Sequence, residues 1–222
     1  MLSLKRKPFE NSQDLLKIYR MAYEKAKYVK DFDEKILAFN DVINYCADSK
    51  LCVEDDSKKR NQVLFWTYNN IGDVFVEKNT KELNDENYFY ALQYYNNALE
   101  FLSSDENKKS VLEKIAFIYG ELQDDMSRQK TLEQIVMVEP DSMKRQAFVE
   151  LAKVTDDVKL QAKYLENALN YVTYENVSVL EKCKNTLDIC AWLLEIYEHI
   201  PKSNSDYERI KTLQKNTISL LD

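Results

Sequence analysis

Two nine-residue segments of this chain follow the same pattern. "YYNNALEFL" begins at Tyr94, and "YLENALNYV" begins at Tyr164, 70 residues later. Both place Asn-Ala-Leu before an aromatic and an aliphatic residue, and apolar residues recur three or four positions apart along most of the chain. That spacing is typical of helices with one buried face. Self-similarity at a regular interval indicates stacked copies of one small helical unit.

Glycine and proline are scarce in the sequence. The 222 residues include 2 glycines and 3 prolines, the residues on which the turns and bulges of β-sheets depend. We therefore predict an all-α fold of about five antiparallel helix pairs in a single domain over residues 12–222. Residues 1–11 are predicted to form a flexible N-terminus, and the last helix is predicted to act as a C-terminal cap.

Capping signals locate the expected helix ends. Pro140 is expected to end one helix, and Asp141 or Ser142 to cap the next. Three residue pairs have the spacing of a capping box: Asp31 with Glu34, Ser178 with Glu181, and Ser205 with Glu208. The ten expected helices cover about residues 12–30, 31–47, 57–78, 88–103, 105–121, 126–138, 141–154, 157–172, 178–200 and 205–221, and a polar connection is expected over 79–87.

Charge and apolar patterning narrow the expected partners. The formal net charge is −7, whereas proteins that bind nucleic acid usually carry a basic face. The one clear basic run, Lys5-Arg6-Lys7, is interpreted as part of a solvated terminus. No apolar run approaches the roughly 18 residues that a membrane-spanning helix needs. We expect a protein or peptide partner, with no nucleic acid and no membrane.

Few residues in the chain could support catalysis or bind a metal. His199 is the only histidine, and the sequence contains no Gly-rich phosphate loop, G-x-S-x-G or H-E-x-x-H motif. The four cysteines include Cys183 and Cys190, which lie two turns apart on one helical face and are interpreted as small buried side chains. No secretory leader is evident. We therefore expect a cytoplasmic, non-enzymatic protein with no cofactor and no metal.

Small residues recur at one position of a helix–turn–helix pattern. Tyr68-x2-Ile71-Gly72-x2-Phe75 is followed by Ala91-x3-Tyr95, and the later copies place a small residue at the position of Gly72. These later small residues are Ala116, Ala152 and Ala191. The pattern resembles the tetratricopeptide repeat family, whose 34-residue unit reads W-x2-L-G-x2-Y and then A-x3-F. The resemblance covers about residues 12–222 and implies a right-handed superhelix of helix pairs, although most units lack the terminal proline.

The resemblance also implies a binding surface. In tetratricopeptide proteins, the first helices of successive pairs line a concave groove that binds a peptide or a protein surface. Asn69 and Asn70 would suit such a groove because an amide both donates and accepts hydrogen bonds, but they could equally be ordinary exposed residues. Trp66 could be an aromatic hot spot or a packing residue. By position, the groove would contain Tyr23, Lys27, Trp66, Asn69, Asn70, Asp73, Glu113, Lys114, Phe117, Gln146, Glu150 and Lys153.

The sequence is also compatible with two other functions. The first is a structural or scaffold subunit that joins a larger assembly or forms a homodimer. The second comes from a looser resemblance of "YEKAKYVKDFDEKILAFNDVI" and "YNNIGDVF" to the 14-3-3 proteins, which implies a phosphopeptide adaptor. At the loosely matching positions, however, Asn69 stands where that family has Lys, and Gly120-Glu121 stands where it has Arg-Tyr.

Overall fold

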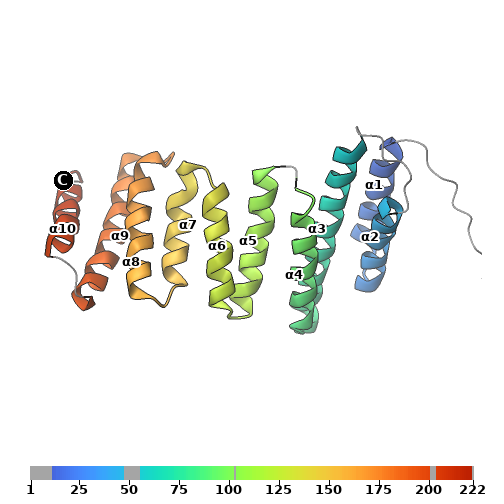
Figure 1. Ribbon diagram of the computed structural model, residues 1–222, viewed down its shortest axis with the longest axis horizontal. Helices are drawn as coiled ribbons and strands as arrows, with labels where there is room; N and C mark the ends of the chain where they lie inside the picture. The colour runs from blue at the N-terminus through green and yellow to red at the C-terminus, as the bar shows by residue number, and fades with distance from the viewer. Residues whose placement is uncertain (1–11, 48–55, 103, 201–203, 222) are drawn as a thin grey trace, which may run out of the picture. The chain divides into compact units, whose positions relative to one another are not determined.

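A computed structural model describes residues 12–47, 56–102, 104–200 and 204–221. In these residues the protein is all-helical and contains no strand, which confirms the all-α prediction (Figure 1). The predicted flexible N-terminus, its Lys5-Arg6-Lys7 run and Cys52 lie outside the described residues. The helices are α1 (Ser12–Tyr28), α2 (Phe32–Ala47), α3 (Asp56–Glu82), α4 (Glu86–Leu99), α5 (Asp105–Glu121), α6 (Asp125–Val138), α7 (Asp141–Lys153), α8 (Val158–Tyr171), α9 (Val179–His199) and α10 (Asn204–Ile218), with a 3-10 turn η1 (Val172–Tyr174) after α8.

Side-chain caps begin several helices where the sequence predicts them. Asp31, which directly precedes α2, accepts a hydrogen bond at its Oδ1 from the backbone N–H of Glu34 in the first turn, at 2.9 Å. Ser178 Oγ does the same for the Glu181 N–H at 3.2 Å at the start of α9. These caps satisfy backbone donors that the first helical turn leaves without a partner. Both capping predictions are confirmed.

The predicted polar connection over 79–87 is largely wrong, because α3 continues to Glu82. The extra turn is polar but helical, and Lys81 pairs with Glu77 one turn earlier at 3.1 Å. The next residue, Leu83, has a φ of 48° and donates its backbone N–H to the Asn79 carbonyl at 2.8 Å. A positive φ at this position is a common way to end a helix.

Two other predicted caps differ from the structure. Pro140 itself occupies the position before α7, and no side chain caps that helix. The Met143 backbone N–H instead donates to the Pro140 carbonyl at 2.9 Å. Ser205 lies inside α10, which begins at Asn204. In both cases the polar residue chosen as the cap lies inside the helix.

Contacts divide the chain into two compact units, residues 1–118 and 119–222. In the first unit, α1 packs on α2, α2 and α1 pack on α3, and α3 packs on α4. Phe39, Val42, Val63 and Ile71 lie at the centre of its apolar core. The prediction of one helical-repeat domain over 12–222 stays a prediction.

The second unit forms its own core around α6 to α10. Helix α7 packs on α6 and α8, and α9 packs on α8 and α10. A largely buried ion pair lies in this unit, where Arg145 Nε is 2.6 Å from Glu175 Oε1. Asn185 Nδ2 donates to the other oxygen of Glu175 at 2.9 Å. The Glu175 carboxylate therefore links α7, the segment after η1, and α9.

The small residues of the repeat pattern mark close contacts inside the units. Gly72 is buried, and a Cβ added there would lie 2.4 Å from Cε1 of the Tyr95 ring on α4. Helices approach closely where the side chains between them are small, and here the approaching group is the aromatic ring itself. Ala116 and Ala152 are also buried, as the sequence predicts.

The prediction of Ala191 as the fourth small residue of the pattern is wrong by one position. Ala191 is exposed, whereas the neighbouring Cys190 and Leu193 are fully buried. The buried face of α9 also contains Cys183 and Tyr197, and these larger residues set the helix orientation. Ala191 lies about 100° around the helix from Cys190, so it points away from the core.

We expect Gly72→Ala to destabilise the protein although alanine is the better helix former. The helix preference favours alanine by about 1 kcal/mol, but the new Cβ would overlap the Tyr95 ring, and such overpacking costs about 1–3 kcal/mol. The free energy of unfolding in urea should therefore fall. Gly120→Ala is the matched control, because its Cβ would meet only the end of the Arg128 side chain, at 3.3 Å. Equal or higher stability of Gly72→Ala would contradict this packing account.

Candidate functional site

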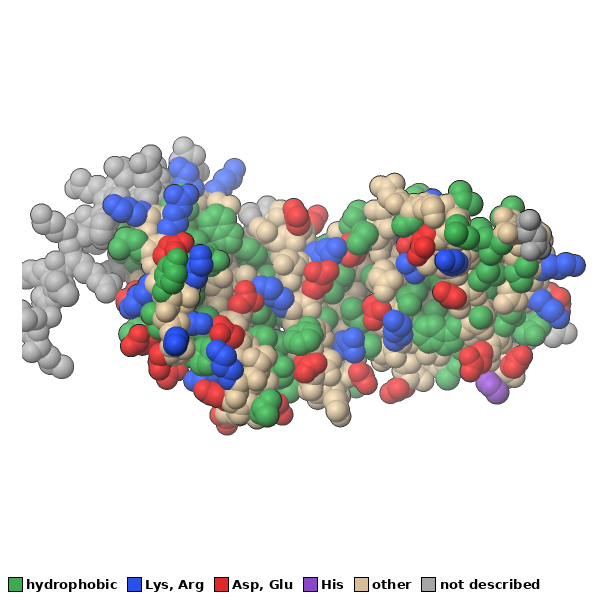
Figure 2. Space-filling model, turned by 180° about the vertical axis from the view of Figure 1, so that it is seen from behind, with side chains coloured by type: hydrophobic (Ala, Val, Ile, Leu, Met, Phe, Trp, Pro, Cys, Tyr) green, Lys and Arg blue, Asp and Glu red, His purple; other side chains and the backbone are tan. Residues whose placement is uncertain are grey.

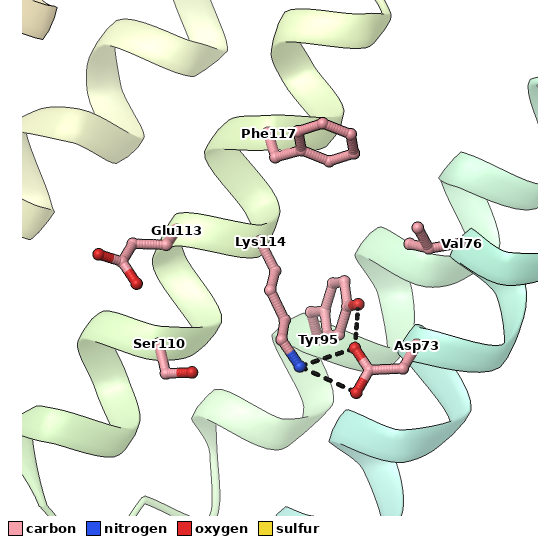
Figure 3. A pocket seen from close by; sticks show the side chains of 7 residues that line it. All are labelled: Asp73, Val76, Tyr95, Ser110, Glu113, Lys114 and Phe117. Carbon is pink, nitrogen blue, oxygen red and sulfur yellow. Dashed lines mark hydrogen bonds and ion pairs between the residues drawn. The ribbon is translucent and has the colours of Figure 1, made fainter. Parts of the chain in front are cut away.

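The first unit contains a cleft between α5 and the pair formed by α3 and α4 (Figure 3). Its volume is about 360 Å³, near the lower end of the range for binding pockets. Helix α3 contributes two lining residues, α4 contributes one, and α5 contributes four that recur along one face. The lining consists of Asp73, Val76, Tyr95, Ser110, Glu113, Lys114 and Phe117.

A closed set of polar contacts forms one part of the cleft. Lys114 Nζ lies 2.7 Å and 2.9 Å from the two oxygens of Asp73 and 3.0 Å from Asn69 Oδ1. Tyr95 donates its hydroxyl to Asp73 Oδ1 at 2.6 Å, and Lys114 Nζ also lies 5.4 Å from the centre of the Tyr95 ring. An ammonium group has three N–H donors, so Lys114 is fully engaged by these partners.

Burial keeps the Tyr95 hydroxyl protonated. Its pKa lies far above the usual value of a tyrosine, first because the side chain is buried and then because of the charge and hydrogen bond of Asp73. Both effects disfavour a phenolate, since burial penalises the charged form and a nearby carboxylate repels it. Tyr95 is therefore a permanent hydrogen-bond donor to Asp73, and it holds that carboxylate in position for Lys114.

The rest of the cleft is exposed and less constrained. The Glu113 side chain is 55% exposed and has one ion pair, with Lys109 at 3.7 Å. Phe117, one turn further along α5, is 53% exposed. In Figure 3, Phe117 and Val76 point toward one another from α5 and α3, whereas Glu113 points away from both. The cleft therefore combines an apolar part with a separate carboxylate.

The groove residues predicted from the sequence fall into three groups. Asp73, Glu113, Lys114 and Phe117 line the cleft, and Asn69 contacts its lysine. The second group lies on α1 or on the part of α3 that contacts it, and it comprises Tyr23, Lys27, Trp66 and Asn70. The third group, Gln146, Glu150 and Lys153, lies on α7 in the other unit, where Glu150 accepts hydrogen bonds from both neighbours, at 3.0 Å and 2.9 Å.

Trp66 and Asn70 contact Tyr19 of α1 and do not line the cleft. Trp66 lies against the Tyr19 ring with 5.5 Å between ring centres, and Asn70 Nδ2 donates to the Tyr19 hydroxyl at 2.9 Å. Asn70 also donates to the Trp66 carbonyl at 2.7 Å, so its amide N–H groups serve the junction of α3 with α1. Tyr23 and Lys27 are exposed on α1 and do not line the cleft.

Three lining residues escaped the sequence-based prediction: Val76, Tyr95 and Ser110. Val76 lies one helical turn after Asp73, and Ser110 lies one turn before Lys114, so helical periodicity could have included both. Tyr95 matched the repeat pattern only as a core residue. The sequence signal that could have placed Tyr95 beside Gly72 is a glycine on one helix of the repeat matched by a large aromatic residue on the next helix.

The described residues offer little chemistry beyond such contacts. No group of three His, Cys, Asp or Glu side chains among them lies close enough to hold a metal ion. Cys46, Cys183 and Cys190 are buried, and burial raises the pKa of Cys46 and of Cys190 to about 11. A thiol with so high a pKa is a poor nucleophile at neutral pH. None of the described helices is both long and apolar enough to cross a bilayer.

Charges of both signs are mixed on the protein surface. Figure 2 shows acidic and basic side chains side by side on the face that it draws, with hydrophobic side chains between them. Around the cleft, the lining contains one cation, Lys114, and two carboxylates. This arrangement differs from the basic stripe that typifies nucleic-acid binding.

Comparisons with known proteins leave the family open. No family model matches the sequence, and no curated protein matches it. Among solved structures, a chain described as "Computational Design of Self-Assembling Cyclic Protein Homooligomers" is 10% identical, with 94% of this chain and 91% of that chain covered. Its TM-score of 0.25 is too low to carry an argument about fold or assembly.

The Tyr95 contact has a counterpart in the second unit that predicts alkaline sensitivity. Tyr164 donates its hydroxyl to Glu133 Oε1 at 2.5 Å, and burial, followed by this bond, raises the pKa of Tyr164 to about 12 from 10.0. The stabilisation from neutral Tyr164 is fully present below pH 10 and is lost as the pH rises from 10 to about 12. We expect the free energy of unfolding to fall over this window, and less steeply for Tyr164→Phe.

The measurement is urea unfolding at one pH below this window and at another within it. Tyr174→Phe is the control, because it removes the hydroxyl of an exposed tyrosine in the same unit, and it should follow the wild-type protein. An unchanged pH dependence in Tyr164→Phe would contradict the assignment.

Proposed function

We propose that the protein is a non-enzymatic interaction module that binds a peptide or a protein surface in the cleft of the first unit. The observation that carries the proposal is the exposed Phe117, which faces Val76 across a cleft built from three helices. Aromatic side chains at the centre of such surfaces commonly supply much of the binding energy.

The proposed architecture is a right-handed, tetratricopeptide-like superhelix of about five helix pairs with α10 as its cap. In that arrangement α3 and α5 would be the first helices of successive pairs, and the cleft would lie on their shared inner surface. Two observations support this assignment: Gly72 makes the close contact that the repeat requires, and α5 presents Lys114 to Asp73 of α3.

The mechanism would be preorganisation. Asp73, Lys114 and Tyr95 hold one another in place before any ligand arrives. A surface that is already ordered loses little conformational entropy on binding. A few contacts to Phe117 and Glu113 could then give useful affinity.

A phosphopeptide adaptor is the less favoured reading. Phosphate recognition usually relies on several Lys and Arg side chains that converge on one point. The cation among the cleft-lining residues is Lys114, and Asp73 and Asn69 already occupy its donors.

Peptide display against the full chain tests the proposal. Peptides selected from an unbiased library should bind the wild-type protein and lose about 2 kcal/mol of binding free energy with Phe117→Ala. Phe89→Ala is the matched control, because Phe89 is 60% exposed on α4 but lies outside the cleft. Selection of no peptide, or equal losses in the two variants, would contradict the proposal.

A structural or homodimeric subunit is the second candidate. Met21 and Tyr28 are exposed on α1 seven residues apart, which places them on one face, and Leu37 is exposed on α2. Large exposed apolar patches often mark protein contacts, and α1 and α2 pack on one another. Sedimentation at increasing concentration should then reveal a dimer that Met21→Ser with Leu37→Ser weakens. A concentration-independent monomer would exclude the homodimer.

A further inference from the structure

The charged side chains around the cleft differ in how closely they are paired inside the protein. Asp73 and Lys114 neutralise one another at 2.7 Å, and the lysine also contacts Asn69. Glu113 is half-exposed, receives no hydrogen bond from the described residues, and lies 3.7 Å from Lys109, beyond hydrogen-bond distance. The charge that remains open to a ligand at the cleft is therefore negative.

The apolar part of the cleft is separate from this carboxylate. Val76 and Phe117 face one another above the Tyr95 ring in Figure 3, whereas Glu113 points to the other side of α5 and Lys114 runs toward Asp73. An aliphatic side chain placed between Val76 and Phe117 would remove apolar surface from water, at roughly 25 cal/mol for each Å² buried. Such a side chain would leave Glu113 accessible to a neighbouring residue of the same ligand.

We propose that the cleft binds an extended peptide that presents an aliphatic side chain to Val76 and Phe117 and a nearby arginine or lysine to Glu113. The proposal rests on the proposed function and adds the chemistry of the ligand. A basic side chain suits the site because its charged head can pair with the carboxylate while its aliphatic stem lies along the helix surface. Arginine adds two parallel hydrogen bonds to a carboxylate.

The electrostatics favour this ligand over an acidic one. An anion entering the cleft would meet Glu113 and could bind Lys114 only by displacing Asp73, which is held by the Tyr95 hydroxyl. The net charge of −7 acts in the same direction, because it attracts cationic partners over longer range.

The test uses synthetic capped peptides with the full-length chain immobilised. One pool carries a central leucine and an arginine at varied nearby positions in an alanine and serine background. Matched pools replace the arginine with citrulline, which has nearly the same shape but no charge, or with glutamate, and a further pool replaces leucine with alanine. Each pool is measured against wild type, Glu113→Gln, Glu106→Gln and Phe117→Ala. Glu106 is the control because it is exposed on α5 but lies outside the cleft.

The arginine pool should bind wild type about fivefold more tightly than the citrulline pool, as expected for one exposed charge pair. Glu113→Gln should remove that preference, and Glu106→Gln should keep it. Equal binding of arginine and citrulline pools, tighter binding of the glutamate pool, or a preference that survives Glu113→Gln would overturn the proposal.

The same data distinguish this inference from the proposed function. Binding that depends on Phe117 and on leucine but not on the charge of the ligand would leave the proposed function intact and refute only the basic ligand. A second outcome is that library peptides bind in a way that depends on Phe117 but none of the synthetic pools does. The proposed ligand chemistry would then be wrong, and the proposed function would stand. If neither the pools nor the library yields such binding, both proposals fail.

Discussion

The missing side chain of Gly72 permits the contact on which the cleft depends. Because Gly72 has no Cβ, the Tyr95 ring of α4 can lie directly against α3. In that position the Tyr95 hydroxyl reaches Asp73 one residue further along α3, and Asp73 in turn holds Lys114 of α5. The close contact between α3 and α4 therefore also helps to place α5, because Tyr95 holds Asp73 and Asp73 holds Lys114.

Tyrosine hydroxyls paired with carboxylates recur in the second unit. Tyr164 donates to Glu133, and Tyr197 donates to Glu166. In each case the pKa of the tyrosine is raised, with burial as the largest cause. A buried tyrosine needs a partner for its hydroxyl, and a carboxylate at the edge of the core supplies one without a second buried polar group. The recurrence provides specific polar contacts between helices that otherwise pack through apolar side chains.

This arrangement explains which side chains remain available for binding. Contacts inside the protein use the groups that first attract attention in the sequence, namely Asn69, Asn70, Asp73 and Lys114. The exposed aromatic ring and the weakly paired carboxylate of α5 are left. In the proposed binding mode, these polar contacts form the base of the cleft, and an apolar side chain and a negative charge at its margin would select the ligand.

Much of the local structure could be predicted from the sequence because it depends on residues close together in the chain. The all-α class follows from apolar spacing and the scarcity of glycine and proline, and the caps at Asp31 and Ser178 act within one helical turn. Helix α5 has the predicted bounds for the same reason. Local signals were weaker where a polar stretch could be either loop or helix, as in the extra turn of α3.

Tertiary contacts decided the rest. The family resemblance placed Asn69, Asp73 and Lys114 in one groove, but the sequence could not show that they would bond to one another, since that depends on distances between segments more than 40 positions apart. The orientation of α9, which exposes Ala191, was likewise decided by its larger apolar residues. The sequence alone determined the helical class, most of the helix positions and three of the four small residues that are buried between helices. Only the packing of the helices determined which polar groups neutralise one another and which face solvent, because that balance depends on the full set of neighbours around each side chain.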